Sequence, residues 1–161
     1  MKLDAKSTIE TGKAILGIEL GSTRIKAVLI DQENKPIAQG SHTWENQLVD
    51  GLWTYSIEAI WSGLQDCYAD LRSNIKNLYG DVEIENLAAI GVSAMMHGYM
   101  PFNEKEEILV PFRTWRNTNT GRAAADLSEL FVYNIPLRWS ISHTCTRLYW
   151  TTKRTSKTSN S

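Results

Sequence analysis

The segment Ala14-Ile-Leu-Gly-Ile-Glu-Leu-Gly-Ser-Thr-Arg-Ile-Lys-Ala-Val-Leu-Ile-Asp31 decides the fold that the sequence predicts. Its two apolar runs, 14–20 and 25–30, are rich in β-branched residues and flank Gly-Ser-Thr-Arg at 21–24. Two such runs around a glycine-containing turn are typical of a β-hairpin. The segment therefore predicts two antiparallel strands joined by a tight turn.

The tip of this hairpin carries polar groups that suit a phosphate ligand. Because alternate strand residues share a face, Glu19 projects from an otherwise apolar strand beside the turn. Gly21 allows positive φ and close backbone approach, and Ser22 and Thr23 offer hydroxyl and amide donors. Lys26 returns a positive charge. The residues alone leave an alternative open, in which the tip is a plain turn with a solvated acid.

Composition limits the class of partner. The chain has 161 residues, about one domain, with 17 basic and 18 acidic side chains. This near-neutral balance argues against nucleic acid or an acidic membrane as the partner and favours a small molecule. The sequence shows no membrane-span-length apolar run and no signal peptide, so we expect a cytoplasmic protein. Cys67 and Cys145 are too few and too distant for a disulfide framework, and Cys67 is expected in the core.

The chain up to residue 80 predicts a strand meander followed by a helix. Residues 1–13 are polar and are expected to form a loose lead-in, and 36–44 reads as a third strand. Ser56 is a plausible N-cap for a helix that ends near Gly80. Gly63 marks either a close helix–sheet approach or a tolerated surface glycine. The helix carries one apolar stripe: Ile57, Ile60, Trp61, Leu64, Tyr68, Leu71, Ile75 and Leu78.

The second half contains two segments that suit a ligand site. Residues 87–94 form a continuous apolar run, which predicts a strand buried on both faces in a parallel pairing. His97 follows the end of that strand, where ligands collect in α/β sheets, although a structural histidine is the alternative. Residues 99–102 read as a further strand with a turn at 103–106. Residues 113–120 have the composition of a hydroxyl-binding site or of a solvated loop, and a helix is expected over 121–133.

Three motifs resemble the start of an FGGY-family carbohydrate kinase of the xylulokinase-like type. They are Glu19-Leu-Gly-Ser-Thr-Arg-Ile-Lys26, Ser93-Ala-Met-Met-His-Gly98 and Arg113-Thr-Trp-Arg-Asn-Thr118. The resemblance covers residues 14–143 and implies an α/β fold, the N-terminal half-domain of a ribonuclease-H-like (actin-like ATPase) protein. It further implies a mixed sheet with an antiparallel three-strand meander plus helices, and ATP and a sugar bound in a cleft between two domains.

The resemblance also implies two groups of site residues. The nucleotide-phosphate group comprises Glu19, which faces magnesium, directly or through water, together with Gly21, Ser22, Thr23 and Lys26. The sugar group comprises Met96, His97, Trp115 and Arg116.

The chain departs from the family pattern at two positions. Glu19 replaces the usual aspartate and is one methylene longer, which puts the metal distance in question. Asn117 stands where many members have an aspartate in a Trp-x-Asp-x-Arg segment, so the identity of the sugar is not carried over.

The reaction that the resemblance implies is transfer of the γ-phosphoryl group of ATP, with Mg²⁺, to a sugar hydroxyl. In the family, the aspartate base, the second phosphate loop and the adenosine site lie beyond the first 161 residues. We therefore expect a fragment that is inactive alone. The alternatives are a non-catalytic nucleotide- or sugar-binding module, an inert remnant and, as a weaker option, a ribonuclease-H-like nuclease. The nuclease would need clustered acids that Glu19 alone does not supply.

The last 18 residues differ from the rest of the chain. Residues 144–161 contain no acidic side chain and show no periodicity, so they read as a disordered basic terminus or as the product of a frameshift after His143. The frameshift hypothesis is tested by sequencing the source DNA, where an intact original frame through codon 143 would contradict it. A half-domain should also expose apolar sheet surface, which favours self-association.

Overall fold

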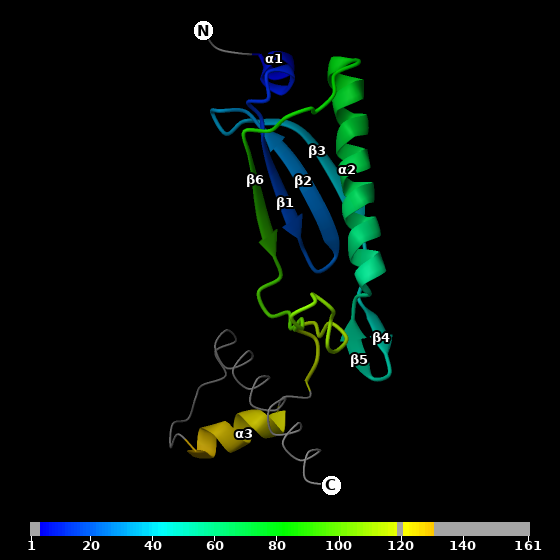
Figure 1. Cartoon of the computed structure of the whole chain (residues 1–161), viewed down its shortest axis with the longest axis vertical. Coiled ribbons are helices and arrows are strands. Elements are labelled where there is room, and N and C mark those ends of the chain that lie inside the picture. Colours follow the sequence, from blue (N-terminus) through cyan, green and yellow to red (C-terminus); the bar gives the residue numbers. More distant parts are fainter. Residues whose placement is uncertain (1–3, 119–120, 131–161) are drawn as a thin grey trace. The chain divides into compact units, whose positions relative to one another are not determined.

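The computed structural model describes residues 4–118 and 121–130. The chain divides into two compact units, residues 1–46 with 56–95 and residues 47–55 with 96–161. The first unit contains a four-stranded sheet in the order β3-β2-β1-β6 (Figure 1). Its strands are β1 (Ile15–Leu20), β2 (Arg24–Ile30), β3 (Pro36–Thr43) and β6 (Ala89–Ala94).

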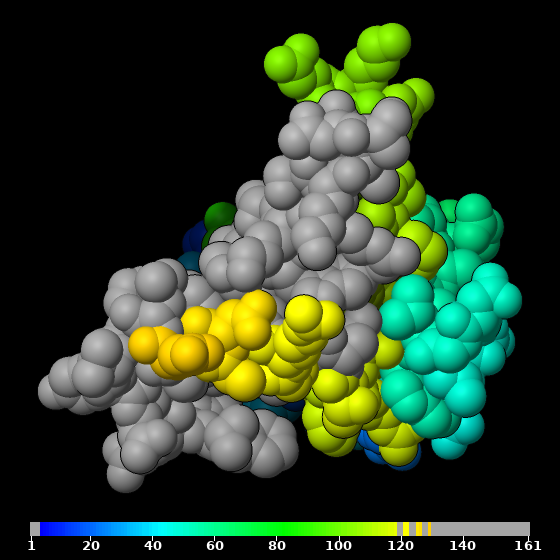
Figure 2. All heavy atoms as spheres, turned by 90° about the horizontal axis from the view of Figure 1, so that it is seen from below, coloured from blue at the N-terminus to red at the C-terminus, as the bar shows by residue number. Residues whose placement is uncertain are grey.

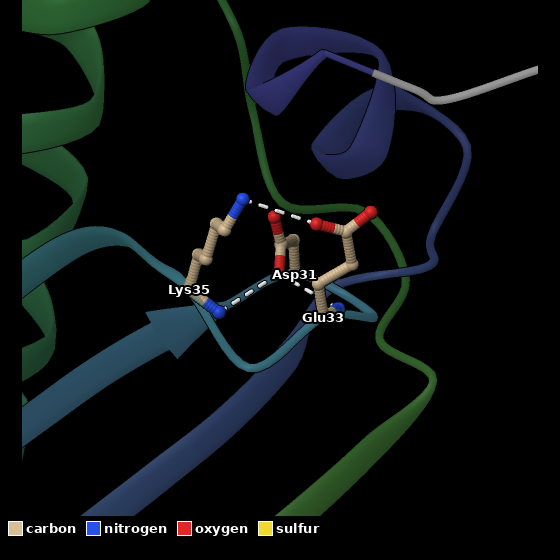
Figure 3. Close-up of polar contacts among 3 residues, drawn as sticks. All are labelled: Asp31, Glu33 and Lys35. Carbon is tan, nitrogen blue, oxygen red and sulfur yellow. Dashed lines mark hydrogen bonds and ion pairs between the residues drawn. The ribbon is translucent and has the colours of Figure 1, made fainter.

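The predicted hairpin and meander are confirmed. β1 pairs antiparallel with β2, and β2 pairs antiparallel with β3. The β2–β3 turn is held by Asp31, whose Oδ1 accepts hydrogen bonds from the backbone N–H groups of Glu33 and Lys35, both at 2.8 Å (Figure 3). The side chains of Glu33 and Lys35 also pair at 3.1 Å. This Asx-type turn lets Asn34 adopt positive φ, as Asp and Asn side chains favour in tight turns.

Helix α2 (Ile57–Tyr79) packs on β3 and β2, as Figure 1 shows. Ser56 caps its N-terminus as predicted, because its side chain accepts a hydrogen bond from the Ala59 N–H at 3.0 Å. Two glycines allow the close approach. A Cβ atom on Gly40 would lie 2.4 Å from the Cys67 carbonyl oxygen, and one on Gly63 would lie 2.8 Å from Ile25 Cδ1. Gly63 therefore marks a close helix–sheet contact.

The buried face of α2 differs from the predicted apolar stripe. Its buried residues are four apart in the sequence, Gly63, Cys67, Leu71 and Ile75, which places them on one line along the helix. Trp61 and Leu78, expected on the buried stripe, are 62% and 56% exposed. The small residues Gly63 and Cys67 let this line of the helix approach the sheet closely, and Leu71 and Ile75 bury their side chains along the same line.

The same helix covers the free edge of β3. The Ser41 N–H donates to Asp70 Oδ2 at 2.8 Å, and the Gln39 N–H donates to Asn74 Oδ1 at 3.3 Å. Unpaired amides on an edge strand are a template for pairing with another chain. Two side chains of α2 thus satisfy the edge amides that the close approach at Gly40 brings within reach.

Strand β6 is parallel to β1, as expected, but the expectation that it is buried on both faces is wrong for the described residues. All of its residues, 89–94, are exposed. Its Ile90 and Val92 are in register with Leu16 and Ile18 of β1, on the face that α2 covers over β2 and β3. Within the part of the chain described, α2 packs on β2 and β3 and leaves this face of β6 open.

Part of the segment that was expected to form a loose lead-in is helical. Residues 5–10 form helix α1 (Ala5–Glu10), which Asp4 caps by accepting a hydrogen bond from the Ser7 N–H at 2.8 Å. That hydrogen bond is the main cause that lowers the pKa of the Asp4 carboxyl. Thr8 and Ile9 are buried, so this mostly polar segment contributes to the core of the first unit.

The second unit contains a hairpin that the sequence analysis did not predict, formed by β4 (Gln47–Val49) and β5 (Leu52–Thr54). Residues 99–113 form two isolated antiparallel bridges, Tyr99–Arg113 and Phe102–Ile108, where a strand over 99–102 was expected.

The two segments of the second unit also contact each other. Tyr55 stacks on Phe112 with ring centroids 6.0 Å apart. The hairpin (cyan) and the segment near residue 115 (yellow) lie side by side in Figure 2, joined by a Thr114 N–H to Trp53 carbonyl hydrogen bond of 3.1 Å.

Helix α3 (Gly121–Leu130) confirms the predicted helix as far as it is described. The remainder of that prediction, residues 131–133, and the calls on Cys145 and on the tail 144–161 lie outside the described residues. No helix among residues 4–118 and 121–130 is long and apolar enough to cross a membrane. Cys67 is a buried free thiol, as expected.

Candidate functional site

The predicted phosphate-contacting residues come together at one end of the sheet. Glu19 and Lys26 are register partners on β1 and β2, and Lys26 Nζ lies 3.6 Å from Glu19 Oε2. Both side chains are about half exposed, so their ion pair contributes little to folding stability and leaves both charges accessible. The acid beside the turn is therefore a solvent-accessible, paired carboxylate.

Of the two properties expected of Gly21, positive φ and close backbone approach, the structure has the second. Gly21 is not one of the described glycines that have a positive φ. Its N–H donates to the Arg24 carbonyl at 3.0 Å, and a Cβ atom on Gly21 would lie 2.8 Å from that same oxygen. Close backbone approach, rather than a left-handed conformation, is what requires glycine here.

Trp44 fixes the shape of this turn, and the sequence analysis did not select it as a site residue. Its Nε1–H donates to the Gly21 carbonyl at 2.8 Å, and its backbone N–H donates to the Thr23 carbonyl at 3.2 Å. The residue is 8% exposed. Carbonyl oxygens repel anions, so engaging two of them with Trp44 makes the turn more suitable for phosphate. The excess of tryptophan in the sequence was the only available signal.

A polar row crosses the sheet at the level of Glu19. In the strand register, Ser41 pairs with Lys26, Lys26 with Glu19, and Glu19 with Ser93. Register partners share a face, and this face is opposite to the one on which α2 contacts Ile25. The row brings one carboxylate, one ammonium and two hydroxyl groups to the same open face, adjacent to the hydroxyl-bearing turn.

The donor set at the turn fits a magnesium ion that is held jointly with a nucleotide. No group of three or more His, Cys, Asp or Glu side chains that could hold a metal exists in the residues described. Mg²⁺ in phosphoryl-transfer sites keeps several waters and is bound by one or two carboxylates together with the phosphates. Glu19 would serve as that carboxylate.

The predicted sugar-binding residues lie in the second unit. Met96 and His97 form a turn directly after β6, and Met96 is 77% exposed whereas His97 is partly buried. Trp115 is 42% exposed. The guanidinium carbon of Arg116 lies 4.8 Å from the centroid of the Trp53 ring and 6.0 Å from that of Trp115. Trp53, on β5, is therefore a neighbour of the sugar-binding group that the sequence analysis missed.

Asn117 anchors this segment to the β4–β5 hairpin. Its Oδ1 accepts from the Trp53 N–H at 2.9 Å, and its Nδ2 donates to the Trp53 carbonyl at 2.8 Å. Nδ2 also donates to the Thr114 carbonyl at 3.0 Å. The side chain is 4% exposed, so the residue that departs from the family pattern is structural in this chain.

Comparison with protein families decides the identity of the chain. Residues 14–158 match the N-terminal domain of the FGGY family of carbohydrate kinases. The chain belongs to the FGGY family of carbohydrate kinases. The match runs beyond residue 143, so it gives no support for a break there, and the frameshift stays a prediction.

Individual relatives agree with this assignment. Xylulose kinase from Bacillus subtilis is 24% identical over 119 residues, which are 74% of this chain and 23% of that protein. The chain thus spans about a quarter of the length of this relative. Several solved structures are similar, and two of them serve as examples. A xyloylose kinase from Brucella ovis has a TM-score of 0.59 at 22% identity, covering 74% of this chain and 24% of that one. A Plasmodium falciparum glycerol kinase with ADP has a TM-score of 0.55 at 16% identity, covering 72% and 23%.

These similarities confirm the fold class predicted from the sequence. The FGGY chain has the mixed sheet of the α/β, actin-like ATPase fold, with an antiparallel meander followed by a parallel fourth strand.

Proposed function

We propose that this chain supplies the nucleotide-phosphate turn and part of the sugar site of an ATP-dependent carbohydrate kinase. The observation that carries the proposal is the pairing of Glu19 and Lys26 beside the turn at residues 21–23. Family membership implies ATP as the phosphoryl donor. Phosphoryl transfer depends on positioned charge around the phosphates and on a metal ion, and this turn offers a carboxylate, an ammonium and hydroxyl donors.

Each residue group has a separate role in this proposal. Glu19 contacts Mg²⁺ directly or through water, Gly21 gives the phosphates close access to the backbone, and Ser22 and Thr23 donate hydrogen bonds to phosphate oxygens. Lys26 neutralises negative charge that develops on the phosphates.

The sugar acceptor is bound by the second group. Met96 and Trp115 present exposed apolar surface to the carbon skeleton, while His97 and Arg116 donate hydrogen bonds to hydroxyl groups. The relatives named above are kinases of a sugar and of glycerol, which supports a polyhydroxylated acceptor.

The experiment is a coupled ATP-consumption assay with a panel of pentuloses and hexuloses. It compares the 161-residue chain with a longer protein in which the reading frame after His143 is restored. We expect turnover from the longer protein alone, because the match covers only 23% of the length of the Bacillus subtilis xylulose kinase. A longer protein that turns over no sugar, or turnover by the 161-residue chain itself, would contradict the proposal.

A non-catalytic binding module is the second proposal, supported by the fact that the turn and the residue 113–118 segment are each held by their own hydrogen bonds. Calorimetry of the 161-residue chain with Mg·ATP and with sugars separates the two ideas. Binding in the millimolar range or tighter supports the module, and no binding supports an inert remnant.

A further inference from the structure

Asn117 holds the backbone of the β4–β5 hairpin as a neighbouring strand would. Its side chain contacts both the N–H and the carbonyl of Trp53, at 2.9 Å and 2.8 Å. A carboxamide is the side-chain group that offers a donor and an acceptor with the geometry of a peptide bond. The third contact, to the Thr114 carbonyl at 3.0 Å, ties the same amide to its own segment.

This arrangement discriminates between asparagine and aspartate, although the two side chains have nearly the same size. Nδ2 faces two carbonyl oxygens, and a carboxylate oxygen in its place would meet them without a proton to share. The site is 4% exposed, so water would not screen the repulsion effectively. Aspartate at position 117 would therefore weaken the attachment of the segment to the hairpin, which the Thr114 N–H to Trp53 carbonyl hydrogen bond of 3.1 Å would still join.

Arg116, the residue before Asn117, contacts the ring of the same tryptophan. The Arg116 guanidinium lies over the Trp53 ring, 4.8 Å from its centroid, and within 6.0 Å of the Trp115 ring. A guanidinium within about 6 Å of an indole face is held by a cation–π attraction. Consecutive residues thus bind the backbone and the side chain of Trp53, so backbone anchoring and guanidinium placement are coupled.

We propose that Asn117 is a positioning residue whose carboxamide holds Trp53, Trp115 and Arg116 together as one preformed platform for a polyhydroxylated ligand. Exposed indole surface packs on the C–H faces of such a ligand, and the guanidinium donates to its hydroxyl groups. This inference deepens the proposed function, on which it rests, by adding Trp53 to the sugar site and by giving Asn117 a role.

The test compares Asn117→Asp with Asn117→Ala and with a matched control, Asn77→Asp, on the exposed face of α2. Sugar dissociation constants are measured by calorimetry at about pH 7.5 and about pH 5. Wild type and Asn77→Asp should bind equally at each pH. Asn117→Asp should bind about tenfold more weakly at the higher pH, because the carbonyl oxygens of Trp53 and Thr114 lose their Nδ2 donor and face a carboxylate oxygen instead.

The pH comparison separates positioning from simple destabilisation. A protonated carboxyl at position 117 regains one donor and one acceptor, so binding by Asn117→Asp should recover towards wild type at the lower pH. Asn117→Ala has no such group and should stay weak at both. The charged groups on the two segments that meet here are Asp50, Arg113 and Arg116. The two arginines favour the carboxylate, whereas burial against carbonyl oxygens favours the protonated carboxyl.

The outcomes distinguish this inference from the proposed function. If wild type binds no sugar of the panel, the proposed function and the sugar assignment of the platform both fail. If wild type binds and Asn117→Asp binds equally well, the positioning role alone fails. Equal weakening of the Asp and Ala variants at both pH values would also overturn it. In the ligand-free Asp variant, the Trp53 backbone amide resonance should shift with pH, and an amide that does not respond would contradict the anchoring itself.

Discussion

At the scale of single residues, Glu19 is the side chain on which the nucleotide assignment depends most. We expect Glu19→Gln to weaken Mg·ATP binding about tenfold, equivalent to ~1.4 kcal/mol, because the variant loses the metal-directed charge. The free energy of unfolding should change by less than about 0.5 kcal/mol, since an exposed ion pair contributes little. Calorimetry and urea denaturation measure the two quantities.

The control for this variant is Glu10→Gln. Glu10 pairs with Lys6 at 3.8 Å, and both side chains are about half exposed, as in the Glu19–Lys26 pair. This variant should keep wild-type affinity for Mg·ATP. Equal loss of binding in both variants would show that general charge, rather than the position of Glu19, governs the affinity.

Cys67 gives a second prediction at the residue scale. Burial against the sheet, with a smaller effect from the nearby Asp70 charge, raises the pKa of this thiol. The unfolded chain therefore loses the thiol proton at lower pH than the folded chain does, and the stability contribution of the protonated thiol is lost as pH rises above the usual thiol pKa. Alkylation at about pH 8 should be at least about a hundredfold slower in the native protein than in denaturant.

Peptide mass spectrometry after iodoacetamide treatment measures the rate at Cys67 separately from that at Cys145. Rapid modification of native Cys67 would mean that α2 does not seal this position against the sheet.

At the scale of elements, the helix–sheet contact depends on Gly40 and Gly63. Gly40→Ala should destabilise the fold by about 3 kcal/mol or more, because the new methyl group would meet backbone atoms of Cys67 and Leu71 that cannot move independently. Gly91→Ala is the matched control on β6, where an added Cβ meets nothing within 4 Å. Thermal unfolding of the two variants should differ clearly, and equal midpoints would contradict the described packing.

The elements show how far the sequence alone could lead. The hairpin, the third strand and the capped start of α2 follow from patterns among residues that are close in the chain. The parallel pairing of β6 was indicated by its continuous apolar run, although its residues are exposed. The β4–β5 hairpin could not be predicted, because its three-residue strands lack a periodic pattern and are held by Asn117, which lies far along the chain. The buried line of α2 depends on Gly40, and no helix pattern reveals a glycine on another element.

The candidate site was predictable to a similar extent. The residues of the turn are consecutive, so motif and geometry coincide at Glu19, Gly21 and Lys26. The roles of Trp44 and Trp53 depend on contacts with residues far away in the sequence. The high number of tryptophans in the chain was the only sequence feature that pointed to them.

At the scale of the whole molecule, the open apolar surface of β6 has a consequence for association. Ile90 and Val92 are 61% and 68% exposed and lie on one face. An exposed apolar strand beside a free sheet edge favours self-association. Val92→Lys should lower the association of the chain without destabilising it, because the position is already solvated. Sedimentation velocity over a concentration series measures the change.

Leu78→Lys serves as the control, because Leu78 is 56% exposed on α2 and lies outside the sheet. If both lysine variants reduce association equally, the effect comes from added charge rather than from the β6 surface.

The most direct measurement of the central claim is an NMR titration of the 161-residue chain with Mg·ATP. The account predicts saturable shifts of the backbone amides of Gly21, Ser22 and Thr23, and their loss in Glu19→Gln. Shifts confined to other parts of the chain, or no shifts at millimolar nucleotide, would contradict the assignment of this turn to the phosphates.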